Sequence, residues 1–319
     1  SANLKFISTV MWDARETFTD AKSDLCIRDS RPLRCFATAD FDLLHQANSA
    51  VTGHAQAAQA LTAAEQRAIV DFEKSLFTAQ ITSNDAGNLS DAGAKGGPGE
   101  LLNTNFYFGI NDLDSGDYKT GAPFNREVMA LFTNWRGLDR PAPANPPGRG
   151  RTPPPAPTPT DIARASIARG EQIFNNKPFN ISRVKGFNDE LRLSLQRATC
   201  ASCHSAPNVG SHSVPRLFNT GVADASLRTP DMPLYTLKNK LTGEIMETTD
   251  PGSALTTGKW RDIGRFKVPS LRAIESRSPY FHNGSVADLT DVVKFYDKRF
   301  GIGLTPQEVN DLTAFLKVL

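Results

Sequence analysis

The sequence predicts a mostly α-helical protein with long loops, on three observations. Several stretches repeat apolar residues at the spacing of an α-helix, and two of them begin with a capping box. Strand signals are weak throughout the chain. A proline-rich run near the middle separates an N-terminal part from a C-terminal part, so we expect two helical domains joined by a linker.

The bulk composition excludes some classes of function. Apolar residues make up 39% of the 319 residues and charged residues 22%, as in ordinary globular proteins. The net charge of +2 gives no electrostatic reason to expect a nucleic-acid partner. No run of 18 apolar residues occurs, so no membrane span is predicted. No signal peptide is recognisable, which indicates a mature form or a fragment.

The linker is predicted from its prolines. Pro141 to Thr160 holds nine of the 21 prolines in the chain. Such a stretch forms neither helix nor sheet and is expected to be an extended, semi-rigid connector. The predicted domains are therefore a loop-rich helical domain over 1–140, a linker over 141–160 and a C-terminal domain over 161–319.

The first and last helices of the C-terminal domain are expected to cross. The first lies at roughly 161–174 and contains Gly170, which costs up to about 1 kcal/mol relative to alanine and usually marks a close crossing. The last helix begins at the capping box Thr305-Pro-Gln-Glu308. Its apolar stripe consists of Val309, Leu312, Phe315, Leu316 and Leu319.

Two more helices are predicted from the same kinds of signal. The helix at about 287–299 is capped by Ser285 or Asp288, and its apolar face is Leu289, Val292, Val293 and Tyr296. In the N-terminal part, the capping box Thr62-Ala-Ala-Glu65 starts a helix whose expected apolar face includes Ile69, Phe72, Leu76 and Phe77.

Cys200-Ala-Ser-Cys203-His204 has the spacing of a covalent attachment site for c-type haem. The two thiols would add across the haem vinyl groups, and His204 would be the proximal iron ligand. A redox dithiol is disfavoured because no βαβ pattern surrounds the motif, and a zinc site because no second ligand pair is near. We therefore expect a mostly α protein in which a cytochrome c-type haem domain follows a loop-rich α domain.

The other two cysteines, Cys26 and Cys35, are expected to form a disulfide across a short polar loop. Such a bridge would contribute roughly 2–3 kcal/mol by restraining the unfolded chain. The alternative is a pair of separate reduced thiols.

Three C-terminal segments and one N-terminal segment resemble a known family. They are Gly264-Arg-Phe-Lys-Val-Pro-Ser-Leu-Arg272, Ser278-Pro-Tyr-Phe-His-Asn-Gly-Ser285, Val292-Val-Lys-Phe-Tyr296 and Ser8-Thr-Val-Met-Trp-Asp-Ala-Arg-Glu16. Together they resemble the bacterial dihaem cytochrome c peroxidases and MauG-type enzymes. The resemblance covers most of the C-terminal half and patches of the N-terminal half. It implies a peroxide-linked oxidoreductase that passes electrons through covalently bound haem.

One departure from the family is the number of haem motifs. The family carries two CxxCH motifs and this chain carries one. Three interpretations remain open: a first haem segment that has been removed, a first haem on a separate polypeptide, or a monohaem relative.

The resemblance also implies candidate haem-contacting residues. It places Tyr296 where family members carry the distal ligand, with Met232 and Met246 as alternatives, and a core tyrosine as the structural alternative. A backbone carbonyl near Pro207 is expected to accept from the other ring nitrogen of His204. Lys267 and Arg272 are candidate partners of the haem propionates, or part of a solvated basic face. His282 is interpreted as a residue at or just behind the haem edge, or as a purely structural residue, and His212 is a weaker candidate.

The resemblance gives Trp12 and Gln56 as candidate catalytic residues in the first domain. Trp12 matches the family tryptophan that relays electrons between haems, or is a core residue. Gln56 lies where the family carries an acid that cleaves peroxide, but an amide cannot act as a carboxylate acid does. His45 and His54 are possible substitutes.

Three functional hypotheses follow from these features. The first is a haem peroxidase or MauG-type oxidase, with hydrogen peroxide as substrate and a small redox protein as partner. The second is an electron-transfer cytochrome without bond chemistry, and the third is a haem subunit completed by a separate first-haem chain or by a second copy. Covalent haem attachment implies export to the periplasm. Calcium, which family members often bind between domains, is a further cofactor to consider.

Overall fold

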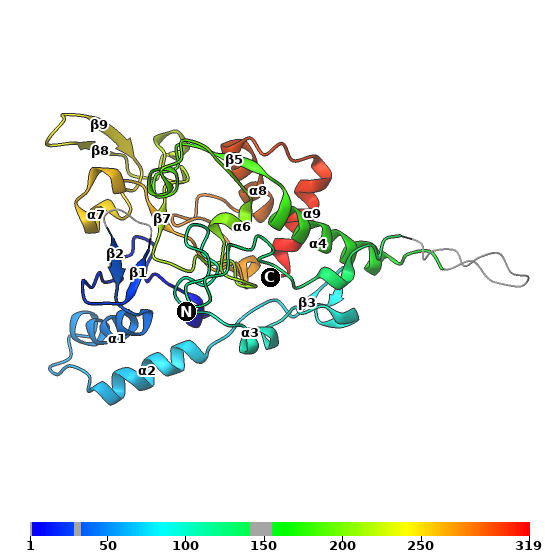
Figure 1. The fold of residues 1–319 in the computed structure, drawn as a ribbon, viewed down its shortest axis with the longest axis horizontal. Coiled ribbons are helices and arrows are strands. Elements are labelled where there is room, and N and C mark those ends of the chain that lie inside the picture. The colour runs from blue at the N-terminus through cyan, green and yellow to red at the C-terminus, as the bar shows by residue number, and fades with distance from the viewer. Residues whose placement is uncertain (1, 29–32, 141–154) are drawn as a thin grey trace, which may run out of the picture.

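The computed structural model describes residues 2–28, 33–140 and 155–319, and within them the prediction of a mostly helical chain is confirmed (Figure 1). The α-helices are α1 (Ala39–Ser49), α2 (Ala63–Ser75), α3 (Gly99–Asn103), α4 (Pro159–Asn176), α5 (Asn188–Leu191), α6 (Cys200–Cys203), α7 (Ala254–Thr257), α8 (Leu289–Phe300) and α9 (Pro306–Lys317). None of the described helices is long and apolar enough to cross a membrane.

The described strands form two-stranded antiparallel pairs. The pairs are β1 (Leu25–Ile27) with β2 (Arg34–Phe36), β3 (Thr82–Ser83) with β4 (Gly87–Asn88), β5 (Phe179–Ile181) with β6 (Gln196–Ala198), β7 (Leu217–Phe218) with β10 (Phe266–Lys267), and β8 (Tyr235–Lys238) with β9 (Ile245–Thr248). Strands this short contain no long alternation of apolar and polar residues, which explains their weak sequence signal.

The close crossing of α4 and α9 at Gly170 is confirmed. A Cβ atom at Gly170 would lie 2.0 Å from the Asp311 carbonyl oxygen and 2.6 Å from Phe315 Cβ, so only glycine fits between the helices. The two helices lie side by side in Figure 1, with α4 in green and α9 in red. The capping box at Thr305 starts α9 as predicted, and Asp288 is the cap of α8.

Helix α4 begins earlier than predicted, inside the expected linker. Thr158 accepts from the backbone N–H of Asp161, and the Asp161 carboxylate accepts from the backbone N–H of Thr158. This makes a further capping box, with Pro159 at the first helical position. The linker prediction is therefore corrected at its C-terminal end. Residues 141–154 of the linker lie outside the described residues.

Helix α4 also binds a segment that precedes the linker. The buried Glu171 carboxylate accepts from the backbone N–H groups of Leu131 and Phe132 at 2.6 and 2.9 Å. The Asn175 amide both accepts from and donates to the Met129 backbone. Residues 128–135 thus pack into the same apolar core as α4, α8 and α9. The division into two domains stays a prediction.

The apolar face predicted for α2 is wrong in part. The capping box at Thr62 is confirmed, but the buried residue of the helix is Val70, and Phe72 is 64% exposed. Val70 packs against Val10 and Leu43 in a small cluster, so the orientation of α2 is set by α1 and the N-terminal segment. Local periodicity carries no information about those distant partners.

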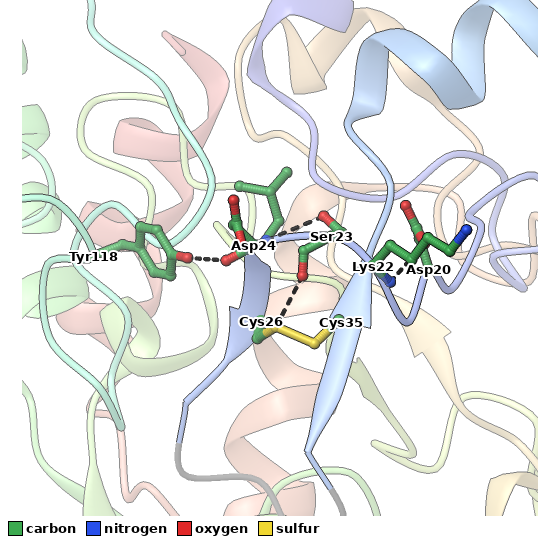
Figure 2. The surroundings of a disulfide bond; sticks show 8 residues. Asp20, Lys22, Ser23, Asp24, Cys26, Cys35 and Tyr118 are labelled. Carbon is green, nitrogen blue, oxygen red and sulfur yellow. Dashed lines mark hydrogen bonds between the residues drawn. A yellow bond between two sulfur atoms is a disulfide. The ribbon is translucent and has the colours of Figure 1, made fainter.

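The predicted disulfide between Cys26 and Cys35 is present. The two cysteines are opposite each other in the β1–β2 pair, with their Cα atoms 4.0 Å apart (Figure 2). Tyr118 donates its hydroxyl proton to the Asp24 carbonyl beside the hairpin, and the Ser23 hydroxyl accepts from the backbone N–H of Leu25 at 3.1 Å. The Tyr118 contact ties the hairpin to a residue far along the chain, and the Ser23 contact closes the turn before β1.

Asp42 of α1 is a buried carboxyl group. It accepts from the backbone N–H of Phe18 at 3.1 Å, which ties α1 to the N-terminal segment. Burial raises the pKa of Asp42 to about 7, and the nearby Glu16 charge adds to this effect. The folded protein therefore holds this proton more tightly than the unfolded chain does.

We expect Gly170→Ala to lower the free energy of unfolding by about 1–3 kcal/mol, because the new methyl group meets the Asp311 carbonyl. Urea denaturation followed by circular dichroism measures the change. Gly53→Ala is the matched control, because nothing lies within 4 Å of its new methyl group. Equal effects of the two substitutions would contradict the close crossing.

We expect Asp42→Asn to flatten the pH dependence of stability between about pH 4 and pH 7. In the wild type the folded-state pKa of Asp42 lies above the usual value for aspartate, so the contribution of Asp42 to stability is most favourable at low pH and falls as pH rises toward 7. Urea unfolding at a series of pH values measures this slope. Asp71→Asn removes an exposed carboxylate from α2 and should leave the slope intact. An unchanged slope in Asp42→Asn would refute the assignment.

Candidate cofactor-binding cavity

The Cys200-Ala-Ser-Cys203-His204 motif forms α6, a single helical turn. The His204 backbone N–H donates to the Cys200 carbonyl at 3.1 Å, and the Thr199 N–H donates to the Ser202 hydroxyl at 3.1 Å. Cys200 and Cys203 are not joined to each other by a disulfide. Burial raises the pKa of both thiols to about 12, so both are protonated at neutral pH.

The His204 ring is oriented by a single backbone carbonyl. Its Nδ1 lies 2.5 Å from the Gly210 carbonyl oxygen, which can only accept, so Nδ1 carries the proton and Nε2 keeps its lone pair. Burial lowers the pKa of His204 to about 4, which keeps the ring neutral. The acceptor comes from the loop after Pro207, as predicted. Gly210 has a φ of +71°, and a side chain there would strike Leu271.

A cavity of about 250 Å³ adjoins the motif, and its walls come from both halves of the chain. Cys200, Cys203 and His204 all line it. Its apolar wall comes from α4, β5, β7, β10, α8, α9 and the loops near them. The residues are Phe174, Phe179, Ile181, Val184, Phe218, Val222, Phe266, Val268, Leu271, Ile274, Phe281, Val292, Val293, Phe300, Ile302, Leu304, Leu312 and Leu316. Apolar walls around two thiols and an imidazole suit a large planar hydrophobic cofactor.

Tyr296 of α8 also lines this cavity. Burial raises its pKa to about 12, an effect that a hydrogen bond with Thr220 partly offsets. Its ring stacks on Phe300, with centroids 6.0 Å apart. The alternative candidates Met232 and Met246 do not line the cavity, and Met232 Sδ lies 3.8 Å from the Asn283 amide nitrogen.

The cations near the cavity differ from the predicted pair. Lys267 lines the cavity, as expected of a residue that contacts a cofactor. Arg272 does not, and its buried guanidinium instead donates to the Gly97 and Asn208 carbonyls. Arg277 lines the cavity in its place. The sequence offered no sign of this, since Arg272 and Arg277 belong to the same basic run.

The two candidate histidines contact the site in different ways. His282 lines the cavity, stacks on Phe266 with centroids 3.9 Å apart, and has Nε2 3.3 Å from the Asp250 carboxylate. His212 is buried behind the motif, and its Nδ1 lies 2.8 Å from the Cys203 carbonyl, so it supports the motif from outside the cavity.

Of the two candidate catalytic residues, the structure brings one to the cavity. Trp12 lines it and is also 38% exposed, while its carbonyl accepts from the Lys267 backbone N–H at 2.9 Å. Gln56 lies on an exposed turn with a φ of 52° and does not line the cavity. His45, paired with Glu16, and His54 are exposed and do not line it either.

No group of three or more His, Cys, Asp or Glu side chains within the described residues is arranged to hold a metal ion.

Several known proteins share sequence with this chain, although no protein-family model matches it. Cytochrome-c peroxidase IdrP1 of Denitromonas iodatirespirans is 33% identical over 146 residues, or 39% of this chain and 37% of that protein. MauG of Paracoccus denitrificans, a methylamine utilization protein, is 54% identical over 35 residues, or 11% of this chain and 9% of that protein. A solved MauG-like protein associated with microbial copper homeostasis is 24% identical, with a TM-score of 0.32 over 48% of this chain and 43% of that one.

The sequence matches to IdrP1 and MauG confirm the resemblance found in the sequence motifs. The chain is a relative of the bacterial cytochrome c peroxidases and MauG-type proteins. The match to IdrP1 spans little more than a third of that protein's length.

Proposed function

We propose that this chain is a c-type haem protein that takes part in peroxide-linked electron transfer. The observation that carries the proposal is the placement of two free thiols and a neutral imidazole on one wall of an apolar cavity. The relatedness to cytochrome c peroxidases supports it.

The residues present fit a covalently attached haem. Each thiol would add across one vinyl group, forming a carbon–sulfur bond while its proton passes to the other vinyl carbon, so no oxidant is needed. His204 would supply Nε2 as the proximal ligand, held in place by the Gly210 carbonyl. Bound haem would supply an iron centre that exchanges one electron at a time. The apolar walls would exclude water from it.

Trp12 is the proposed route for oxidising equivalents between the cavity and the surface. Its indole forms part of the cavity wall and is partly open to solvent. Its backbone is fixed to β10 by the hydrogen bond with Lys267, so the indole is held at the cavity edge. In the family this tryptophan lies between two haems.

Tyr296 is the proposed sixth ligand, ahead of Met232 and Met246. It lines the cavity on α8, and neither methionine does. In the protein alone the Tyr296 phenol is neutral, because its pKa is raised. To coordinate iron as a phenolate it would have to release its proton, which the positive charge of a bound iron would favour. A phenolate is a hard anionic donor and would favour the ferric state.

The second candidate function is an electron-transfer cytochrome or a haem subunit completed by another chain. One observation favours it: Gln56, at the position of the family's peroxide-cleaving acid, is exposed and lies outside the cavity. Export to the periplasm is proposed for either function, because the Cys26–Cys35 disulfide forms and persists in an oxidising compartment.

We expect the protein from its native host to carry one covalent haem for each copy of this segment, measured by intact mass and the pyridine haemochrome spectrum. Cys200→Ala should leave one thioether bond and shift the haemochrome band, and the Cys200→Ala/Cys203→Ala variant should lose haem on denaturation.

Peroxide-dependent oxidation of a reduced cytochrome donor would identify the peroxidase, and a haem that does not react with peroxide would identify the carrier. A wild type without covalent haem would refute both.

We expect Tyr296→Phe in the haem-loaded protein to change the ferric absorption spectrum and to raise the reduction potential, because the anionic ligand is lost. Phe300→Leu is the control, since it alters the aromatic ring beside Tyr296 without removing a donor. An unchanged spectrum and potential in Tyr296→Phe would leave Tyr296 as an ordinary core residue.

A further inference from the structure

The cavity wall carries positive charge without any described negative charge. Lys267 and Arg277 line it, and no Asp or Glu is among its described lining residues. Neither cation forms an ion pair with a carboxylate in the part of the chain that the structure describes. A cation inside an apolar wall is costly unless an anion faces it.

Two buried arginines elsewhere in the chain, Arg216 and Arg265, are paired with acids. Arg216 contacts Asp112 at 3.2 Å and Glu190 at 3.4 Å. Arg265 contacts Glu190 at 2.9 Å, and Asp189 as well. The contrast shows that acids are available next to the site and are directed away from the cavity, toward these arginines.

The positions of the two cavity cations are fixed by backbone contacts. Lys267 Nζ lies 3.4 Å from the Thr9 carbonyl, and the backbone N–H of Lys267 donates to Trp12. Arg277 donates from Nη1 to the Ser270 carbonyl at 3.2 Å, and its exposed side chain places it at the opening of the cavity. No further hydrogen bond of either side chain is made to the residues that the structure describes, so their remaining donors can meet a ligand.

The two cations also act on each other. Burial lowers the pKa of Lys267 to about 8, and the positive charge of Arg277 lowers it further. Partial desolvation by the surrounding protein lowers the pKa of Arg277 too, although its side chain reaches solvent. Two like charges close enough to repel are stabilised together by an anion that faces both.

We propose that Lys267 and Arg277 form a carboxylate subsite at the cavity opening, and that its occupants are the two propionate groups of the haem. This rests on the proposed function. A haem held at one edge by the thioethers of Cys200 and Cys203 has its propionates on another edge, where two cations would neutralise two carboxylates. Arg277, rather than the predicted Arg272, is the second partner.

The test is the midpoint reduction potential of the haem-loaded protein, measured by spectroelectrochemistry. Loss of a cation leaves a propionate charge unbalanced, and that charge stabilises ferric iron. We expect Lys267→Met and Arg277→Met each to raise the ratio of ferric to ferrous haem about tenfold at a fixed applied potential. This corresponds to a midpoint reduction potential that is lower by ~59 mV. Arg277→Lys keeps the charge and should restore most of the wild-type value.

Arg261→Met is the matched control, because it removes the same charge from an exposed side chain in the same basic run, outside the cavity. If the two cavity variants shift the potential no more than Arg261→Met does, the subsite is refuted while the haem assignment stands. A wild type without covalent haem would instead refute the proposed function itself.

A second arm distinguishes the haem's own carboxylates from a free one. Titration of the haem-loaded wild type with succinate should leave the absorption spectrum unchanged, because propionates already fill the subsite. A saturable spectral change that Arg277→Met abolishes would show that a free carboxylate is the occupant and would overturn the propionate assignment.

Discussion

The backbone contact between α4 and α9 at Gly170 determines the position of one wall of the cavity. Because Gly170 has no side chain, the Asp311 carbonyl can approach its backbone closely. A Cβ atom at position 170 would lie only 2.0 Å from that carbonyl oxygen. This approach brings Phe174 of α4 to 5.7 Å from Phe315 of α9 and 6.0 Å from the His204 ring, measured between centroids. The adjacent residues of α9, Leu312 and Leu316, then line the cavity. A larger residue at position 170 would displace all of these side chains together.

Hydrogen bonds from buried polar groups fix the loops that the helices leave unsupported. Glu171 and Asn175 hold the 129–132 backbone, and the Gly210 carbonyl fixes the His204 ring. A buried group that binds two or more partners leaves little freedom for a loop to move. The site therefore presents a neutral imidazole at a set position even though most of its surroundings are loops rather than long helices.

The charged side chains around the cavity fall into two sets. Acids behind the motif pair with Arg216 and Arg265, and the cations Lys267 and Arg277 face the cavity without a described acid. An arrangement of this kind favours an anionic, largely apolar cofactor over a cationic one. It also fits the proposed connection to a partner through Trp12, which is the aromatic residue shared by the cavity wall and the surface at this edge.

The sequence alone determined the features that depend on residues close together in the chain. The capping boxes at Thr62 and Thr305, the motif at Cys200 and the Cys26–Cys35 bridge were all predictable, because their geometry is set within a few residues or by covalent chemistry. The crossing at Gly170 was predictable because a glycine inside a helix costs stability and usually marks a close approach of another element. Only the tertiary structure decided that α2 buries Val70, that β7 pairs with β10, and that Arg277 rather than Arg272 faces the cavity. These outcomes depend on partners far along the chain, whose direction in space is not encoded in local spacing.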